Sequence, residues 1–138
     1  MSLYNIFKIS GSAMSAQNVR LNTTASNMAN AESISSSVGE TYKARHPVFS
    51  AVYQSAADGN LAGAGVSVAG IVENQAPPRV KYQPDNPMAD ENGNVYLPNV
   101  NIVEEMANMI SASRNYQANV QIANTAKTLL QRTLSLGQ

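Results

Sequence analysis

The side chains that could take part in chemistry are few and far apart. His46 is the one histidine, in the segment YKARHPVF, and the chain has no cysteine. A histidine serves as a general base when a nucleophile or an orienting carboxylate accompanies it, and no such motif surrounds His46. Without cysteine, neither a disulfide nor a thiolate metal site can form. We therefore expect His46 to be a surface or interface residue, and we expect no catalytic, cofactor-binding or metal-binding residues.

The segment DENGN, Asp90 to Asn94, has acid and amide side chains at alternate positions, as a calcium-binding loop does. A calcium loop also requires glycine at its sixth position and an acid at its twelfth. Here glycine is the fourth residue and Asn101 is the twelfth, which favours a plain turn. The glycine-rich segment NLAGAGVSVAG lacks both the Lys-Ser/Thr pair of a P-loop and the spacing of a dinucleotide fingerprint.

Charge is sparse in this chain of 138 residues. Charged residues make up 13% of it, against about a quarter in an average protein, and nine basic residues balance nine acidic ones. The basic pairs Lys43/Arg45 and Arg79/Lys81 are too isolated to form a nucleic-acid surface. No run of apolar residues approaches the length of a membrane span, and the N-terminal segment lacks the apolar core of a secretory signal peptide. We expect no nucleic acid partner and no membrane insertion.

Steps of seven residues predict an N-terminal core helix over residues 1–31. The residues at this spacing are Phe7, Met14, Leu21 and Met28, with Leu3 on the same side. The neighbouring face carries Asn, Ser and Thr, and no acid occurs before Glu32. Amides and hydroxyls exchange hydrogen bonds across a contact, whereas a buried unpaired charge is strongly unfavourable. We expect this uncharged face, including Asn27 and Asn30, to contact another subunit; a compatible alternative is a helix that orders only on assembly.

The middle of the chain has a different texture. Residues 32–49 contain many small polar residues without a period, which predicts a loop and an extended linker interrupted by Pro47. Residues 50–99 contain the segments GVSVAGIVENQ, RVKYQ and NVYLP, which are typical of strands, and the turn pair Asn92-Gly93. This region is predicted to be a small β-rich insert with a modest core.

The helical period returns after Pro98 and predicts a C-terminal core helix over residues 100–138. One apolar line, spaced alternately by four and three residues, contains Ile102, Met106, Met109, Tyr116, Val120, Ala123, Leu130 and Leu134. A second line on another side contains Ala118, Ile122, Leu129 and Leu136.

Two helices with apolar stripes at the two ends of one chain are expected to pair. The predicted fold is α+β: long terminal helices form a coiled-coil-like core, and the β-rich insert lies between them in sequence. The first line of the C-terminal helix, with the heptad residues of the N-terminal helix, forms the predicted intramolecular seam. A helix that is apolar on a second side must also be buried there, which in so short a chain requires other subunits. The second line is therefore the predicted subunit interface.

The two terminal segments resemble the rod and hook axial proteins of the bacterial flagellum. The Ser-x-Asn-apolar-Ala-Asn signature of these proteins is similar to the run Ser26, Asn27, Met28, Ala29 and Asn30. The segment from Asn99 to Gln138 resembles the closing helix of a rod protein over almost its whole length. A spacer, Glu32 to Glu40, precedes TYKARHPVF here, as in the proximal rod component and unlike the hook and distal rod.

This resemblance implies a structural subunit that polymerises into the drive shaft crossing the periplasm. It implies export by the flagellar type III apparatus without a cleaved signal peptide. Implied neighbours are copies of the chain in a helical assembly, other rod proteins, the adaptor at the rod base and, around the rod, ring proteins and peptidoglycan. Two other classes are weighed against it. A small secreted coiled-coil adhesin or translocator would also pair terminal helices, and an enzyme is disfavoured because no acid, base, nucleophile or metal set converges.

Overall fold

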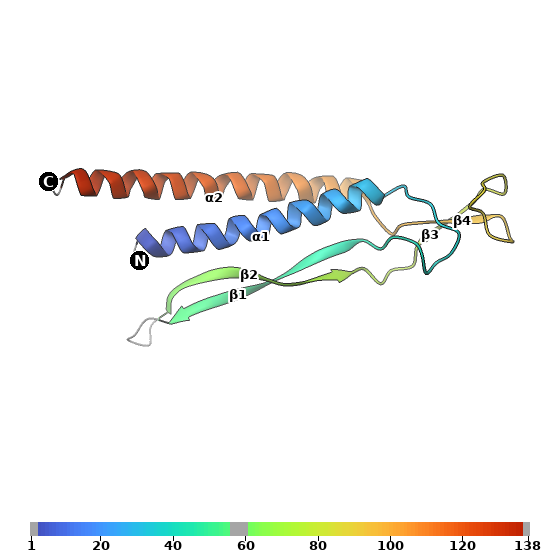
Figure 1. Ribbon diagram of the computed structural model, residues 1–138, viewed down its shortest axis with the longest axis horizontal. Helices are drawn as coiled ribbons and strands as arrows, with labels where there is room; N and C mark the ends of the chain where they lie inside the picture. The colour runs from blue at the N-terminus through green and yellow to red at the C-terminus, as the bar shows by residue number, and fades with distance from the viewer. Residues whose placement is uncertain (1–2, 56–60, 137–138) are drawn as a thin grey trace.

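Two long helices and four strands make up the molecule, which confirms the predicted α+β class. In a computed structural model, which describes residues 3–55 and 61–136, the elements are α1 (Leu3–Asn30), β1 (Arg45–Ser55), β2 (Leu61–Glu73), β3 (Arg79–Tyr82), β4 (Asn94–Leu97) and α2 (Ile102–Leu136). α1 lies between α2 and the β1–β2 hairpin and contacts both (Figure 1). The described part is elongated, and β3 and β4 lie beyond the helix pair at the end opposite the free helix ends (Figure 1).

The start of α2 is fixed by an asparagine cap. The side-chain oxygen of Asn101 accepts the backbone N–H of Val103 at 3.1 Å, and its carbonyl accepts the N–H of Glu105 at 3.0 Å. Glu104 and Glu105 occupy the first turn, where carboxylates interact favourably with the positive end of the helix dipole. This arrangement starts the helix immediately after the break at Pro98.

Small side chains form the contact between the two helices. The buried residues of α2 are Glu105, Ala112 and Ala126, and α1 is the one described helix or strand that packs along α2. Ala16 of α1 is also buried. Alanine at a contact allows two helix axes to approach more closely than leucine does.

This contact line corrects the predicted seam. Each buried residue of α2 comes one position before a member of the predicted heptad line, a rotation of about 100° around the helix. The half-buried seam residues are Phe7, Met14, Leu21, Met28, Met109, Val120 and Ala123. The exposed ones are Ile102, Met106, Tyr116, Leu130 and Leu134. The physical reason is that closely spaced helices place the larger side chains beside the contact rather than within it. The side chain of Leu3, also assigned to the seam, lies outside the described residues.

The hairpin of β1 and β2 runs antiparallel along α1. Arg45 pairs with Glu73 at one end and Ser55 with Leu61 at the other. The hydroxyl of Ser12 on α1 accepts the backbone N–H of Val66 at 3.2 Å, which attaches β2 to the helix. β1 begins within the segment expected to be a linker. The strand continues through Pro47 because both strands of a two-stranded sheet are edge strands, which tolerate a residue without an N–H.

A second two-stranded sheet, β3 with β4, lies beyond the helices. Tyr96 of β4 exchanges backbone hydrogen bonds with Ser35 at 3.0 and 3.1 Å, which holds the loop after α1 against this sheet. Ala31, Ala44 and Val100 form a small apolar cluster where the linker crosses between the two ends of the helices. The strands expected in one insert therefore belong to two separate sheets, each connected to the helix pair.

Candidate assembly site

The histidine lies beside a buried carboxylate. His46 Nδ1 is 3.9 Å from Oε1 of Glu105, and the Glu105 side chain is 4% exposed against 43% for His46. The second carboxylate oxygen of Glu105 has no hydrogen-bond partner among the described residues. Within residues 3–55 and 61–136, no three acidic or histidine side chains gather in a way that could hold a metal ion. We assign the pair a structural role, which links β1 to the start of α2.

The DENGN segment is a turn held by its first residue. One carboxylate oxygen of Asp90 accepts the backbone N–H groups of Asn92 and Asn94 at 2.9 and 2.8 Å, and the other accepts the Tyr96 hydroxyl at 3.0 Å. The hydrogen bond from the Asn94 backbone is the largest cause that lowers the pKa of Asp90 below its usual value, and the bond to Asp90 raises the pKa of Tyr96. Gly93 has a φ of 77°, which favours glycine at this position.

A group of polar side chains fixes the start of β1 to α1. We call Ser26, Asn27, Tyr42 and the backbone of Arg45 the polar clamp. The side-chain oxygen of Asn27 accepts the Arg45 N–H and the Tyr42 hydroxyl, both at 2.9 Å, and its amide group donates to the Arg45 carbonyl at 2.8 Å. The Ser26 and Tyr42 hydroxyls are 3.2 Å apart. Asn27 thus makes to Arg45 the pair of hydrogen bonds that a neighbouring strand would make.

The polar clamp corrects the interpretation of the uncharged face of α1. Asn27 was expected to contact another subunit, but its exposed fraction is 0% and its hydrogen bonds stay within the chain. Thr23 and Thr24 on the same part of α1 are buried too. Residues here are polar and uncharged because the chain's own linker and hairpin cover them, and a lone charge would be desolvated. Asn30 is half-buried, with its amide group donating to the Ser26 carbonyl at 2.8 Å, and its contact with a neighbour stays a prediction.

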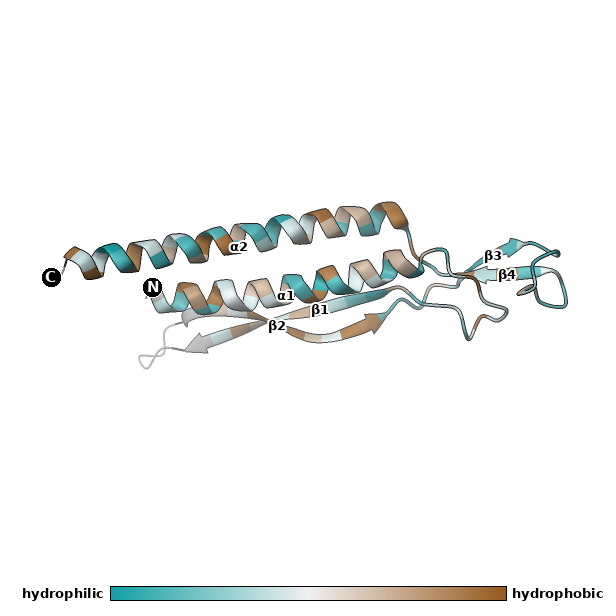
Figure 2. Ribbon diagram, turned by 45° about the horizontal axis from the view of Figure 1, so that its top comes forward, coloured by the Kyte–Doolittle hydropathy of each residue, from teal (hydrophilic) through white to brown (hydrophobic). Residues whose placement is uncertain are grey.

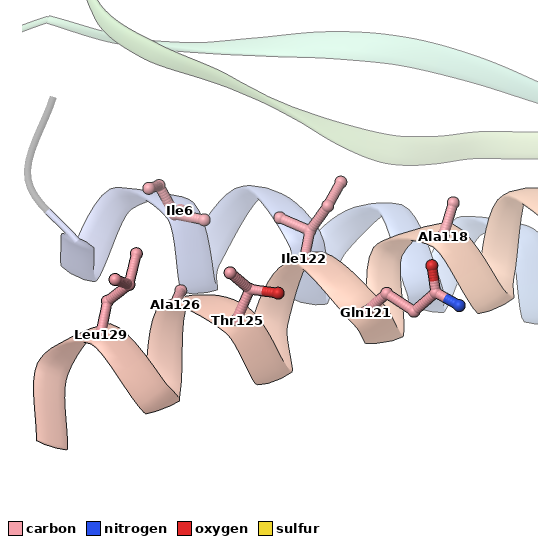
Figure 3. A pocket seen from close by; sticks show the side chains of 7 residues that line it. All are labelled: Ile6, Ala118, Gln121, Ile122, Thr125, Ala126 and Leu129. Carbon is pink, nitrogen blue, oxygen red and sulfur yellow. The ribbon is translucent and has the colours of Figure 1, made fainter. Parts of the chain in front are cut away.

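An apolar groove runs between α1 and α2 near the free ends of the helices, and we call it the outer groove. Its volume is about 450 Å³, and its lining consists of Ile6 from α1 and Ala118, Gln121, Ile122, Thr125, Ala126 and Leu129 from α2 (Figure 3). Ile122 and Leu129 are each 50% exposed. Three of the residues predicted to contact another subunit therefore meet in one surface feature.

Leu136, the fourth predicted interface residue of α2, lies beyond the outer groove and is 86% exposed. All residues from Lys127 to Leu136 are exposed. In two views the C-terminal end of α2 extends past the N-terminal end of α1 (Figures 1 and 2). We call residues 130–136 the overhang. The overhang has no packed partner among the described residues, which adds a second uncovered apolar surface next to the outer groove.

Sequence reasoning did not find the polar residues that join the linkers. Asn99 accepts the Ala44 N–H at 2.9 Å and donates to the Ala76 carbonyl at 2.8 Å. Arg79 donates to the carbonyls of Pro98 at 3.1 Å and Ala31 at 3.2 Å. Both side chains satisfy backbone carbonyls outside helices and strands. Their positions beside the proline breaks are the signal that would have indicated this role.

Comparisons with known proteins agree with the resemblance in the terminal segments. The family described as "Flagella basal body rod protein" matches residues 7–32, and the one described as "Flagellar basal body rod FlgEFG protein C-terminal" matches residues 91–136. The chain is 51% identical to the flagellar basal-body rod protein FlgC of Salmonella typhimurium and 53% identical to that of Yersinia enterocolitica. It is 46% identical to that of Buchnera aphidicola from Schizaphis graminum.

Each of these alignments covers 100% of both chains. The two family matches cover α1 and α2, the helices that carry the outer groove. Full-length similarity at this level, together with the paired terminal helices, confirms the predicted family: the chain belongs to the flagellar basal-body rod proteins.

Proposed function

We propose that this chain is a structural subunit of the proximal flagellar rod and polymerises through its terminal helices into the shaft that transmits torque across the periplasm. The relatives' names support the rod. The observation that carries the mode of assembly is the outer groove, because it leaves apolar side chains of both terminal helices uncovered in a single subunit. Such a protein acts by binding its neighbours and not by catalysis.

The outer groove offers enough apolar surface to contribute to subunit binding. Ile122 and Leu129 are each 50% exposed, so a neighbour can still bury about half of each side chain. Full burial of such a side chain is worth about 1.5–3 kcal/mol, so the remaining half contributes roughly 1 kcal/mol for each. Ile6 on α1 adds to this surface. An assembled contact of this kind is repeated for every subunit in a polymer.

The location in a rod also suggests the partners. We infer that neighbouring rod proteins, the rod-base adaptor and further copies of the chain cover the helices. We infer also that ring proteins and peptidoglycan surround the β-rich side, and that the type III apparatus exports the chain without cleavage. Among the described residues, no helix combines the length and hydropathy needed to cross a membrane. The alternative of a secreted adhesin or translocator finds no support in relatives that are all named rod proteins.

The experiment is a charge placed in the outer groove. Leu129→Asp puts a carboxylate on the surface that a neighbour must desolvate, so basal bodies purified from cells expressing this variant should lack the chain and the cells should not swim. Gln131→Asp is the matched control, since it adds the same charge to an exposed position of α2 outside the groove lining. Circular dichroism of both purified variants should match the wild type. Normal swimming of Leu129→Asp cells, with the chain present in their rods, would contradict the proposal.

A further inference from the structure

Charge is divided between the two ends of this elongated molecule. All nine acidic residues lie between Glu32 and Glu105, whereas the segments before and after them carry five of the nine basic residues and no acid. Three of those basic residues, Lys8, Lys127 and Arg132, belong to the parts of α1 and α2 near the free helix ends (Figure 1). The molecule is therefore basic at the end where the helices terminate and acidic toward the other end.

The overhang is both basic and apolar. Leu130, Leu134 and Leu136 are 40, 65 and 86% exposed, and Arg132 lies among them. Because α2 extends past α1, no part of the described chain can cover these leucines from the side (Figures 1 and 2). A partner for this surface has to bring apolar side chains and a negative charge.

The opposite end of the helix pair has those properties. At the start of α2, Val103 is 75% exposed and stands next to the exposed Glu104 (Figure 2 shows the hydrophobic first turns). The loop after α1 adds the exposed Ile34 and Val38. Ala31 and Val100 pack together in the small apolar cluster, which places this loop and the start of α2 at the same end of the molecule.

We propose that copies of the chain bind head to tail, with the overhang of one copy docked on the start of α2 in a second copy. This inference rests on the proposed function and adds the polarity of the contact. Leu134 and Leu136 meet Val103, and Arg132 pairs with Glu104. The two patches lie at opposite ends of the molecule, so the contact is heterologous and leads to an open chain. Contact between two overhangs is disfavoured because both carry Lys127 and Arg132 without an acid.

The test uses charge reversal in the purified full chain, with association followed by sedimentation velocity over a range of concentrations and salt. Arg132→Glu and Glu104→Arg should each weaken association about tenfold, as expected for a favourable surface pair turned into a repulsive one. A 1:1 mixture of the two variants should restore association, because each variant then meets the opposite charge. Arg114→Glu is the matched control, since it makes the same change at an exposed site in the middle of α2. Leu136→Ser removes only an apolar contact and should also weaken association.

Three results would overturn the head-to-tail contact: a monomer at every concentration, a closed wild-type dimer that does not grow, or no recovery in the mixture. Equal effects of Arg114→Glu and Arg132→Glu would overturn it as well, since they would reflect net charge alone. The proposed function is tested separately in cells. If Arg132→Glu subunits enter the rod normally while Leu129→Asp subunits do not, the rod function stands and the head-to-tail contact is wrong.

Discussion

Replacing Asn27 by alanine should destabilise the subunit strongly although the side chain is small and uncharged. Asn27→Ala removes the three hydrogen bonds that connect α1 to Arg45 and Tyr42. It also leaves the N–H and the carbonyl of Arg45 without the partners that Asn27 provides. The effect should therefore exceed that of an ordinary substitution on a helix.

The magnitude follows from the number of bonds. A buried hydrogen bond contributes about 1 kcal/mol net, so three bonds correspond to about 3 kcal/mol of the free energy of unfolding. Tyr42→Phe removes only the hydroxyl that donates to Asn27, and to which Ser26 also lies close, and should cost about 1 kcal/mol. In the Asn27→Ala background the Tyr42→Phe change should cost less, because one of its partners is already absent; the coupling free energy should be about 1 kcal/mol.

Urea unfolding of the purified chain, followed by circular dichroism at the helix band, measures these differences. Asn22→Ala is the matched control, since Asn22 is exposed on the same helix and its change should stay within about 0.5 kcal/mol. If Asn27→Ala costs less than about 1 kcal/mol, or if no coupling to Tyr42 is found, the polar clamp does not hold β1 to the helix and our account of the Asn27 position is wrong.

Three further predictions concern other parts of the chain. Ala112→Leu should lower the free energy of unfolding by about 1–3 kcal/mol, because the buried Ala112 sits in the close helix contact, whereas Ala107→Leu on the exposed side should be nearly neutral in the same urea assay. The lowered pKa of Asp90 means that its folded form binds fewer protons, so its contribution to stability is present above about pH 4 and is lost as pH falls through the lowered pKa. Thermal unfolding of the wild type should thus lose more stability in this acid range than that of Asp90→Asn. Fusion of the first 40 or so residues to an unfolded reporter should direct its secretion by flagellated cells, and secretion of a chain without them would refute this.

The elements with a long, regular period could be predicted from the sequence. The heptad spacing of Phe7, Met14, Leu21 and Met28 indicated α1, and Asn101 with Glu104 marks the start of α2. The same reasoning failed for the side of α2 that faces α1. It assigned the contact to the largest apolar residues, whereas the contact is formed by Ala112 and Ala126, whose small size permits close approach. Periodicity gives the direction of a stripe, but side-chain size decides which of two adjacent stripes lies inside.

The candidate site was predicted in part. Ala118, Ile122 and Leu129 were recognised because they form a second apolar line on a helix that already had one, and they meet in the outer groove. Ile6 was not recognised because its position depends on where the N-terminal end of α1 lies along α2. Asn27 was misassigned because a polar residue without charge fits a subunit contact and an internal contact equally well. Only the return of the chain at Arg45 distinguishes the two.

The pairing of the first helix with the last has a consequence for the timing of folding during synthesis. About 70 residues separate the end of α1 from the start of α2. At roughly 5–20 residues per second, a ribosome needs several seconds to produce that stretch. Throughout this interval α1 lacks its main partner, and an isolated helix of its length is only marginally stable in water. The chain therefore cannot acquire its helix pair while it is being made, so a nascent subunit reaches its release from the ribosome without the contact that later makes it rigid.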